Sequence, residues 1–406
     1  MKNLAFSRWA KSAWLAPILC MCSIGFTTAC SDSEVDYNPS AYINDEAKLS
    51  MLHGVKDLEK NKGRIYELNY TADYKLNEAL AAQISGLADL QRFAVTHLFD
   101  QLPSGKSVQQ LSFGANCSAF AATEATNGHF MMGRNYDFCH KNKNGGEDEI
   151  AALVIHTAPE GGKRSVSVVD GYWLGYKRGF YVDGNTDLSM LMLAPYAPMD
   201  GMNEDGFAIG VLHLDGLPTI QNEENKPTIY LSVAMRMLLD KASTVKEAVE
   251  LLKQYNMNME SEALGSYHFY MADATGDYAI VEYVDPKGDV DNFHPATLDV
   301  LTGSEAWRYT TNFYNSSFMN TSSYGPLLSD HGRKRYNKMK DVIDEANARI
   351  TAKEAMVLLD SVSQAANTKD LTSHTQWSSL YDLSQRKLTL HLLREYKKKA
   401  FTFKIK

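Results

Sequence analysis

After residue 113 the chain reads as blocks of short strands separated by pairs of helices, and this order of elements restricts the fold most. Runs of strand length cover residues 113–122, 129–135, 151–156, 165–169, 207–214, 268–272, 279–283, 376–383, 387–393 and 400–405. Helical patterns fall between them at 229–241, from 244 onward, at 333–347 and at 352–364. Strands and helices that do not alternate one by one indicate an α+β fold with largely antiparallel sheets.

The N-terminus has the composition of a secretory signal peptide. Basic residues precede an apolar stretch over 13–26, and small residues lead up to Cys30. A Cys at this place resembles the lipobox of bacterial lipoproteins, so we expect 1–29 to be removed and Cys30 to carry lipid. The expected location is the outer membrane, at its periplasmic face or the cell surface. The alternative is an ordinary signal peptide with an incidental Cys.

Charge and cysteine content exclude several classes of protein. The formal net charge is −8, whereas nucleic-acid binders usually carry a basic surface, so we expect no nucleic-acid partner. Of five cysteines, two leave with the signal peptide and Cys30 would be lipidated, which leaves Cys117 and Cys139. That number cannot build a disulfide scaffold or a cysteine zinc site. The histidines show no ligand spacing, so neither a metal nor a cofactor is expected.

The region before residue 113 carries weaker signals. Residues 30–65 are polar and are interpreted as a tether. Apolar positions from Leu76 to Leu98 recur at helical spacing, which predicts one amphipathic helix ending near Pro103.

The strongest local signal is the Asn-Gly pair at 127–128, between two apolar runs, which predicts a β-hairpin. A two-residue turn there would place Ser118 opposite Asp137 and Cys117 opposite Phe138. Arg134 is expected farther along the strand and on the opposite face, so its long side chain or a bulge would have to bring it to the thiol. The hairpin therefore gathers a thiol, a carboxylate and a guanidinium.

Such a set suits nucleophilic catalysis. A thiol attacks as the thiolate, and nearby cations lower its pKa. If the chain were cut before Cys117, the new α-amine, with an ordinary pKa of about 7.7–8, could take the thiol proton. Asp137 would then orient the amine and Arg134 would stabilise negative charge.

These residues also carry a resemblance to a known family. Cys117-Ser-Ala-Phe, followed by Gly133-Arg-Asn-Tyr-Asp137, resembles the nucleophile strand of the choloylglycine hydrolase and acid ceramidase-like family of N-terminal-nucleophile amidases. Segments similar to its later motifs follow in order at 201–208, 268–283, 309–312, 334–336 and 377–383. The resemblance implies a four-layer αββα sandwich over 117–406, preceded by a helical prosegment over 66–116 that packs against it.

The resemblance also implies roles for residues outside the hairpin. Asn312 corresponds to the oxyanion-hole Asn, and Arg335 to a late active-site Arg. His213 stands where bile-salt members carry Asn. It is interpreted either as a second oxyanion donor, which would make activity sensitive to pH near about 6.5, or as an ordinary histidine of a strand.

The implied activity is hydrolysis of a linear amide in an N-acylated small molecule, through a thioester on Cys117. The long segment before Cys117 looks like precursors that cut themselves, and this layout favours N-acyl lipid amides as substrates. The alternatives are a conjugated bile salt hydrolase, a penicillin V acylase, an acyltransferase to an amine, or an inactive lipoprotein that binds ligands with the same fold.

Two further features have alternative interpretations. Cys117 and Cys139 lie near facing positions of the expected hairpin, so a cross-strand disulfide is conceivable and would favour the binding protein. The aromatic residues Tyr172, Trp173, Tyr176, Phe180 and Tyr181 belong either to the core or to a cleft for an acyl chain.

Overall fold

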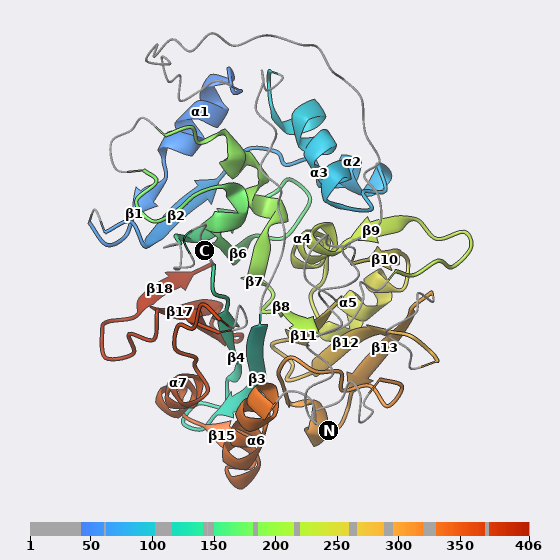
Figure 1. Ribbon diagram of the computed structural model, residues 1–406, viewed down its shortest axis with the longest axis vertical. Helices are drawn as coiled ribbons and strands as arrows, with labels where there is room; N and C mark the ends of the chain where they lie inside the picture. Colours follow the sequence, from blue (N-terminus) through green and yellow to red (C-terminus); the bar gives the residue numbers. More distant parts are fainter. Residues whose placement is uncertain are drawn as a thin grey trace. The chain divides into compact units, whose positions relative to one another are not determined.

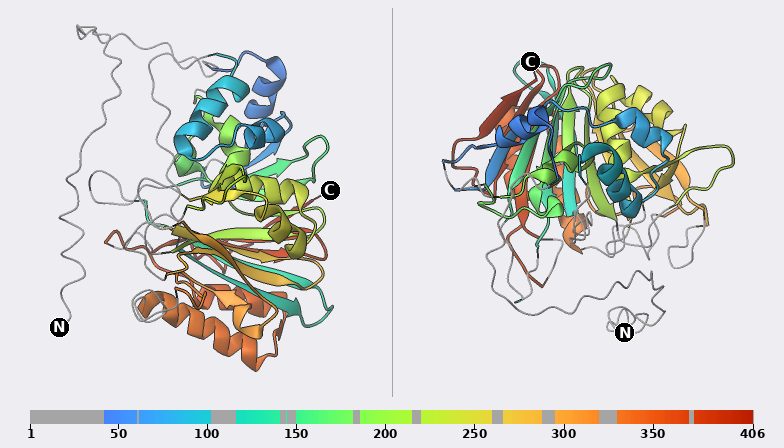
Figure 2. Two further views of the ribbon diagram at one scale, coloured as in Figure 1. Left: turned by 90° about the vertical axis from the view of Figure 1, so that its right-hand side faces the viewer. Right: turned by 90° about the horizontal axis from the view of Figure 1, so that it is seen from above.

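The computed structural model describes residues 42–60, 62–101, 116–140, 144, 150–181, 186–214, 220–259, 266–287, 295–319, 330–369 and 373–405. The expected signal peptide and Cys30 lie outside these residues. In the described part of the chain, two large sheets stack face to face (Figures 1 and 2).

The first sheet has nine strands in the order β1-β2-β5-β6-β7-β8-β11-β12-β13. Their bounds are Lys56–Asp57, Ile65–Tyr70, Ala152–Thr157, Ser165–Asp170, Pro198–Asn203, Ala208–Leu214, Ser266–Ala272, Tyr278–Val284 and Thr297–Thr302, in that order. All neighbours run antiparallel except β2 and β5, which are parallel. A separate parallel pair joins β9 (Thr228–Tyr230) and β10 (Asn256–Asn258).

The second sheet has seven strands and contains the candidate nucleophile. Its order is β14-β3-β4-β16-β17-β18, with β15 paired to β3. The bounds are Tyr309–Thr310, Asn116–Glu124, Phe130–Asp137, Thr375–Asp382, Lys387–Leu392 and Phe401–Lys404, and β15 is Arg349–Ile350. Only the short β15 pairs in parallel here.

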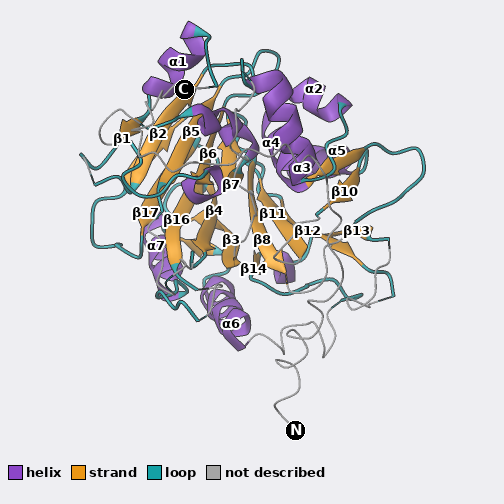
Figure 3. Ribbon diagram, turned by 45° about the horizontal axis from the view of Figure 1, so that its top comes forward, coloured by secondary structure: helices purple, strands orange, loops and turns teal. Residues whose placement is uncertain are grey.

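Helices form the two outer layers. On the nine-stranded sheet lie α4 (Leu231–Lys241) and α5 (Val245–Leu252), with the N-terminal helices beside them; α6 (Asp330–Glu345) and α7 (Ala352–Ser361) cover the seven-stranded sheet. Figure 2 shows the layers edge-on, and Figure 3 shows α6 and α7 separated from the other helices by strands. The α+β class and the αββα sandwich are therefore confirmed.

Short polar signals place these helices along the chain. Thr244 accepts a hydrogen bond from the Glu247 N–H, and Thr351 forms a full capping box with Glu354, so α5 and α7 begin where the sequence predicted. Shorter helical turns cover Gly171–Leu174, Ser189–Tyr196 and Glu305–Trp307. Within the described residues no helix has the length and apolarity to cross a membrane.

The N-terminal segment, residues 42–101, lies on the first sheet, and its secondary structure differs from the predicted tether and helical prosegment. The predicted tether contains α1 (Glu46–His53) and β1, and the predicted helical prosegment contains β2. β2 pairs with β5, and its apolar side chains, including Ile65, Leu68 and Tyr70, are buried. A strand that pairs in parallel needs a partner that is distant in sequence, which a local pattern does not identify.

The predicted helix from Leu76 to Leu98 is also interrupted. The structure has α2 (Leu76–Ala81), α3 (Leu87–Phe93) and a π-helical turn over Ala94–Leu98. The break falls at Ser85 and Gly86, where the Ser85 hydroxyl donates to Asp89 at 2.6 Å. Serine and glycine both favour helix ends over helix interiors, which explains the interruption.

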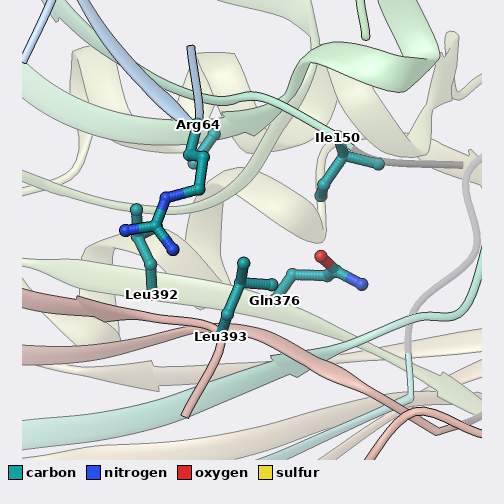
Figure 4. A pocket seen from close by; sticks show the side chains of 6 residues that line it. Arg64, Ile150, Gln376, Leu392 and Leu393 are labelled. Carbon is teal, nitrogen blue, oxygen red and sulfur yellow. The ribbon is translucent and has the colours of Figure 1, made fainter. Parts of the chain in front are cut away.

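An ion pair fastens the N-terminal segment to the C-terminal strands. Arg64 donates to Glu395 at 3.0 Å, and its backbone carbonyl accepts from the N–H of Ala152 at 2.9 Å. A cavity of about 10 Å³, lined by Arg64, Ile150 and Gln376 among others, lies beside it (Figure 4). It is about large enough for one water molecule, so the two segments pack closely.

Candidate active site

The candidate nucleophile is the second residue of β3. β3 and β4 form the predicted hairpin, with Cys117 opposite Tyr136 and Asp137 opposite Asn116. The expected pairing of Cys117 with Phe138 is therefore wrong by two positions.

The register differs because the turn covers residues 125–128 and is therefore centred one residue before the Asn-Gly pair. The Glu124 carboxylate accepts from the N–H groups of Thr126 and Asn127 at 2.9 and 3.0 Å, and the Glu124 N–H donates to the His129 carbonyl at 2.7 Å. The loop is built on this carboxylate, with Gly128 in the left-handed region at φ 77°. Ser118 consequently lies opposite Asn135 instead of Asp137.

Arg134 lies on the same face of the hairpin as Cys117, so the expectation of opposite faces is wrong. Arg134 is opposite Ala119, two residues from Cys117. Opposed residues point to the same side and alternate residues share a face, so all three side chains face together. The Arg134 Nη2 donates to the Cys117 sulfur at 3.0 Å, and no bulge is needed.

The nine-stranded sheet holds the Arg134 guanidinium in place. Its Nη1 pairs with the Asp200 carboxylate, and its Nη2 donates to the Val211 carbonyl at 2.6 Å. A Cβ at position 210 would lie 2.7 Å from Cδ and Nε of Arg134, so Gly210 is required where the arginine crosses β8. The guanidinium is thus fixed between the sheets.

Asp200 is a site residue that the sequence analysis missed. Its buried carboxylate accepts from Trp377 Nε1 and Ser379 Oγ, both at 3.0 Å, and from the Tyr381 hydroxyl. The three donors are alternate residues of β16, and therefore share one face. Trp377, Ser379 and Tyr381 could have indicated this site from the sequence. They are hydrogen-bond donors at every second position of a buried strand, and such donors need a buried acceptor.

Asn312 and Arg335 hold the backbone of Cys117. The Cys117 N–H donates to Asn312 Oδ1 at 2.9 Å, and its carbonyl accepts from Arg335 Nη1 at 2.9 Å. Arg335 Nη2 also donates to Asn312 Oδ1 at 2.8 Å. Two residues from distant parts of the chain therefore meet at both main-chain polar groups of the candidate nucleophile.

Asp137 faces the helices α6 and α7. Its carboxylate accepts from Thr375 Oγ1 and Gln364 Nε2, both at 2.6 Å, and pairs with Arg335 at 3.2 Å. The structure thus brings Cys117, Arg134, Asp137, Asn312 and Arg335 together, and adds Gln364 and Thr375. The catalytic roles of these residues remain predictions.

The thiol is not ionised in the uncut chain. Cys117 is fully buried, and burial raises the pKa of its thiol to about 12, although Arg134 acts in the opposite direction. The nitrogen of Cys117 is an amide in this state and cannot serve as a base. The site therefore holds a cation for the thiolate, but it lacks the α-amine that would remove the proton.

His213 contributes its backbone to the site. Its carbonyl accepts from Asn312 Nδ2 at 2.9 Å, and its ring packs edge-on against Tyr267. Burial, with a contribution from His268, lowers the pKa of His213 to about 4, so the ring is neutral near pH 7. The expected sensitivity to pH near 6.5 is therefore wrong for this residue. A role as second oxyanion donor remains a prediction.

The two alternative interpretations from the sequence can be compared with the structure. Cys117 and Cys139 are both thiols and no disulfide links them. Trp173 and Tyr176 are buried in the main core, and Trp173 Nε1 donates to the Tyr136 hydroxyl at 3.1 Å.

Within the described ranges, no group of three or more His, Cys, Asp or Glu side chains is arranged to hold a metal.

The resemblance implied an αββα sandwich, and the structure has one with a buried thiol at the start of β3 and a buried arginine on the neighbouring β4. Residues 117–328 match the family of linear amide C–N hydrolases, choloylglycine hydrolase family. The matched range is more than half of the chain and begins at Cys117. The chain belongs to this family.

Individual relatives are more distant. The chain is 31% identical over 125 residues to a penicillin V acylase from Pectobacterium atrosepticum, a match that covers 28% of this chain and only 33% of that relative. A mutant conjugated bile acid hydrolase from Clostridium perfringens superposes with a TM-score of 0.46 at 15% identity, covering 71% of this chain and 92% of that one. The penicillin V acylase from Agrobacterium tumefaciens superposes with a TM-score of 0.42 at 17% identity, covering 68% of this chain and 83% of that one.

Proposed function

We propose that the chain is a cysteine amidohydrolase that cleaves the linear amide bond of an N-acylated small molecule through a thioester on Cys117. The observation that carries the proposal is the Arg134 guanidinium, 3.0 Å from the buried sulfur. A cation held there by Asp200 stabilises a thiolate. Membership of the family supports the linear amide as the bond that is attacked.

The reaction requires a free amine on Cys117. The α-amine takes the thiol proton, and the sulfur attacks the amide carbonyl carbon. The C–N bond breaks, and the proton passes to the departing amine. Water then hydrolyses the thioester, which restores the thiol and releases the acid. Asn312 is the proposed oxyanion donor, while Asp137 and Arg335 hold the nucleophile.

The amine arises by self-cleavage between Asn116 and Cys117. The thiol attacks the Asn116 carbonyl, the peptide C–N bond breaks, and the thiol proton ends on the nitrogen of Cys117. Water opens the resulting thioester. Intact-mass measurement should find a chain beginning at Cys117 in wild type, and one piece in Cys117→Ala. A wild-type protein that is active yet uncut contradicts this step.

After cleavage the N-terminal segment stays bound, because β2 remains paired with β5 and its side chains are buried. If Cys30 carries lipid, this segment anchors the catalytic chain to the membrane of an exported lipoprotein. Cys30→Ala should then release both chains into the soluble fraction. Pelleting of that variant with membranes would show that the anchor lies elsewhere.

For the substrate we favour long-chain N-acyl amides. The panel is N-acyl amino acids, N-acyl ethanolamines, glycine- and taurine-conjugated bile salts and penicillin V, with Cys117→Ala as the blank. Faster turnover of bile salts or penicillin V than of every fatty acyl amide would overturn this preference. It would not contradict the proposal that the protein is an amidase. Acyl transfer is tested by adding a free amine to the assay and measuring the new amide that forms.

The second candidate is a binding protein of the same fold, since the thiol of the uncut chain is buried and protonated. No hydrolysis of any panel member, by protein with a demonstrated free amine on Cys117, would favour that candidate. Labelling of Cys117 by an electrophile, with turnover of at least one amide, would exclude it.

A further inference from the structure

The loop after β14 carries Asn312 and is fixed on both sides of that residue. Before it, Thr310 pairs with β3 in the seven-stranded sheet. After it, the main-chain N–H groups of Asn315 and Ser316 donate to the two carboxylate oxygens of Glu282, each at 2.8 Å. Glu282 belongs to β12 in the nine-stranded sheet (Figure 1). Asn312 therefore lies where the loop bridges the two sheets.

The Glu282 carboxylate is fully buried and accepts a main-chain hydrogen bond at each of its two oxygens. Asn315 Nδ2 donates to it at 3.1 Å, and His268 Nδ1 lies 3.1 Å away on the opposed position of β11. Among the described residues no Lys or Arg pairs with it. A buried carboxylate without a strong cation is costly unless hydrogen bonds compensate for the lost water. Most of that compensation comes from the loop.

The Asn315 side chain joins the two fixed points. Its Nδ2 also donates to Thr310 Oγ1 at 2.8 Å, so the carboxylate, Asn315 and Thr310 form one connected set of hydrogen bonds. The loop is thereby closed around Asn312. On the other side, Asn312 Oδ1 accepts hydrogen bonds from the Cys117 N–H and from the Arg335 guanidinium.

We propose that Glu282 is a positioning residue for Asn312: its carboxylate sets the path of the 312–316 loop and hence the place of the Asn312 amide at the nucleophile. This inference rests on the proposed function, in which Asn312 stabilises the oxyanion. A shift of about 1 Å in such a group can cost roughly 10²-fold in rate. Glu282 never touches the substrate and acts only through the loop.

The test uses Glu282→Gln in the full chain, which preserves size but turns one acceptor oxygen into a donor facing N–H groups. We expect kcat of the cut protein to fall about 10- to 100-fold with KM within about twofold, because Asn312 acts in the transition state. Asn312→Ala should cost much less in the Glu282→Gln background than in wild type. If the kcat losses of Glu282→Gln and Asn312→Ala multiply in the double variant, the two residues act independently and the proposal is overturned.

The matched control is Asp299→Asn. Asp299 lies opposite Glu282 on β13 and bonds the Ser316 hydroxyl, so it reaches the same loop through a side chain instead of the main chain. We expect its kcat to stay within about threefold of wild type. An equal loss in both variants would indicate general damage and would overturn the specific role of Glu282.

Hydrogen exchange separates this inference from the proposed function. Amides of residues 315 and 316 should lose protection in Glu282→Gln while strand amides of β11 and β12 keep theirs, whatever substrate the protein takes. Unchanged protection would overturn the proposal even if activity falls. If Glu282→Gln does not fold, Asn315→Ala, which leaves the carboxylate and both main-chain bonds in place, should lower kcat in the same direction but by less. Wild type that hydrolyses nothing refutes the amidase but leaves the exchange result valid.

Discussion

Among the described residues, the two arginine–aspartate pairs with the least exposed side chains have different surroundings. Arg134 pairs with Asp200 across the two sheets and donates to the Cys117 sulfur. Arg236 pairs with Asp240 within α4 at 2.6 Å. The first pair is part of the candidate active site, whereas the second lies against the N-terminal segment.

The hydrogen-bond partners of Asp200 and Asp240 show how the surroundings of the two ion pairs differ. Asp200 accepts hydrogen bonds from β16, and so orders residues of the hydrolase domain. Asp240 accepts from the Tyr74 hydroxyl at 2.6 Å, and Tyr74 belongs to the segment that self-cleavage would separate. A buried ion pair often contributes little net stability, so its environment is the better guide to its role. In the proposed function, the first pair would place a positive charge beside the nucleophile, and the second would hold the N-terminal segment against α4.

The largest effect should follow Asp200→Asn. This change leaves the Arg134 charge buried without its carboxylate, which typically costs about 3–5 kcal/mol of unfolding free energy. The guanidinium also loses its fixed place beside the sulfur, so we expect kcat to fall at least about 10²-fold. Urea unfolding and turnover measure the two effects. A variant that is destabilised but retains wild-type kcat would mean that Arg134 does not serve the thiol.

Asp240→Asn should separate stability from chemistry. Breaking the second pair should also cost about 3–5 kcal/mol, because Arg236 is equally buried. The kcat of the folded fraction should stay within about threefold of wild type, since no candidate site residue contacts this pair. Loss of kcat comparable to that of Asp200→Asn would remove the distinction between the two pairs.

Tyr74→Phe is a smaller test of the same contact. It removes one hydrogen bond to a buried carboxylate, worth about 1.5–3 kcal/mol, and keeps the aromatic ring. In the cut protein the loss should appear as weaker retention of the N-terminal chain on a column that captures the catalytic chain. Unchanged retention would show that the Tyr74–Asp240 hydrogen bond does not help to hold the two chains together.

Part of this arrangement could be predicted from the sequence because it is local. Cys117, Arg134 and Asp137 lie within one hairpin, and the threonines at 244 and 351 mark the starts of helices by their own hydrogen bonds. The alternation Ile65-Tyr-Glu-Leu-Asn-Tyr70 was also a usable strand signal, with polar residues at every second position, but it was interpreted as tether and helix.

The rest depends on contacts between distant segments. Asp200 meets Arg134 across the sheets, and Tyr74 meets Asp240 from the N-terminal segment, so no local pattern indicates either pair. The hairpin register was missed because the Glu124 carboxylate lengthens the turn beyond its Asn-Gly pair. Motif order indicated Asn312 and Arg335, but Glu282 is distant in sequence from the loop that it holds, so no motif indicates that contact.

The smallest expected effect concerns a partly buried titratable group, His213, for which the described residues supply no ion-pair partner. Its pKa of about 4 lies below the ordinary 6.5, so the folded state resists protonation. The contribution of neutral His213 to the free energy of unfolding is fully present above pH 6.5. It is lost as pH falls toward 4, because the unfolded chain then binds a proton that the folded chain does not. His213→Phe keeps a ring against Tyr267 and removes the titration. The difference in Tm between variant and wild type should therefore grow in favour of the variant as pH falls from 6.5 to 4. A constant offset across that range would show that His213 takes up its proton as readily in the folded protein as in the unfolded chain, unlike the two arginines, which stay charged throughout.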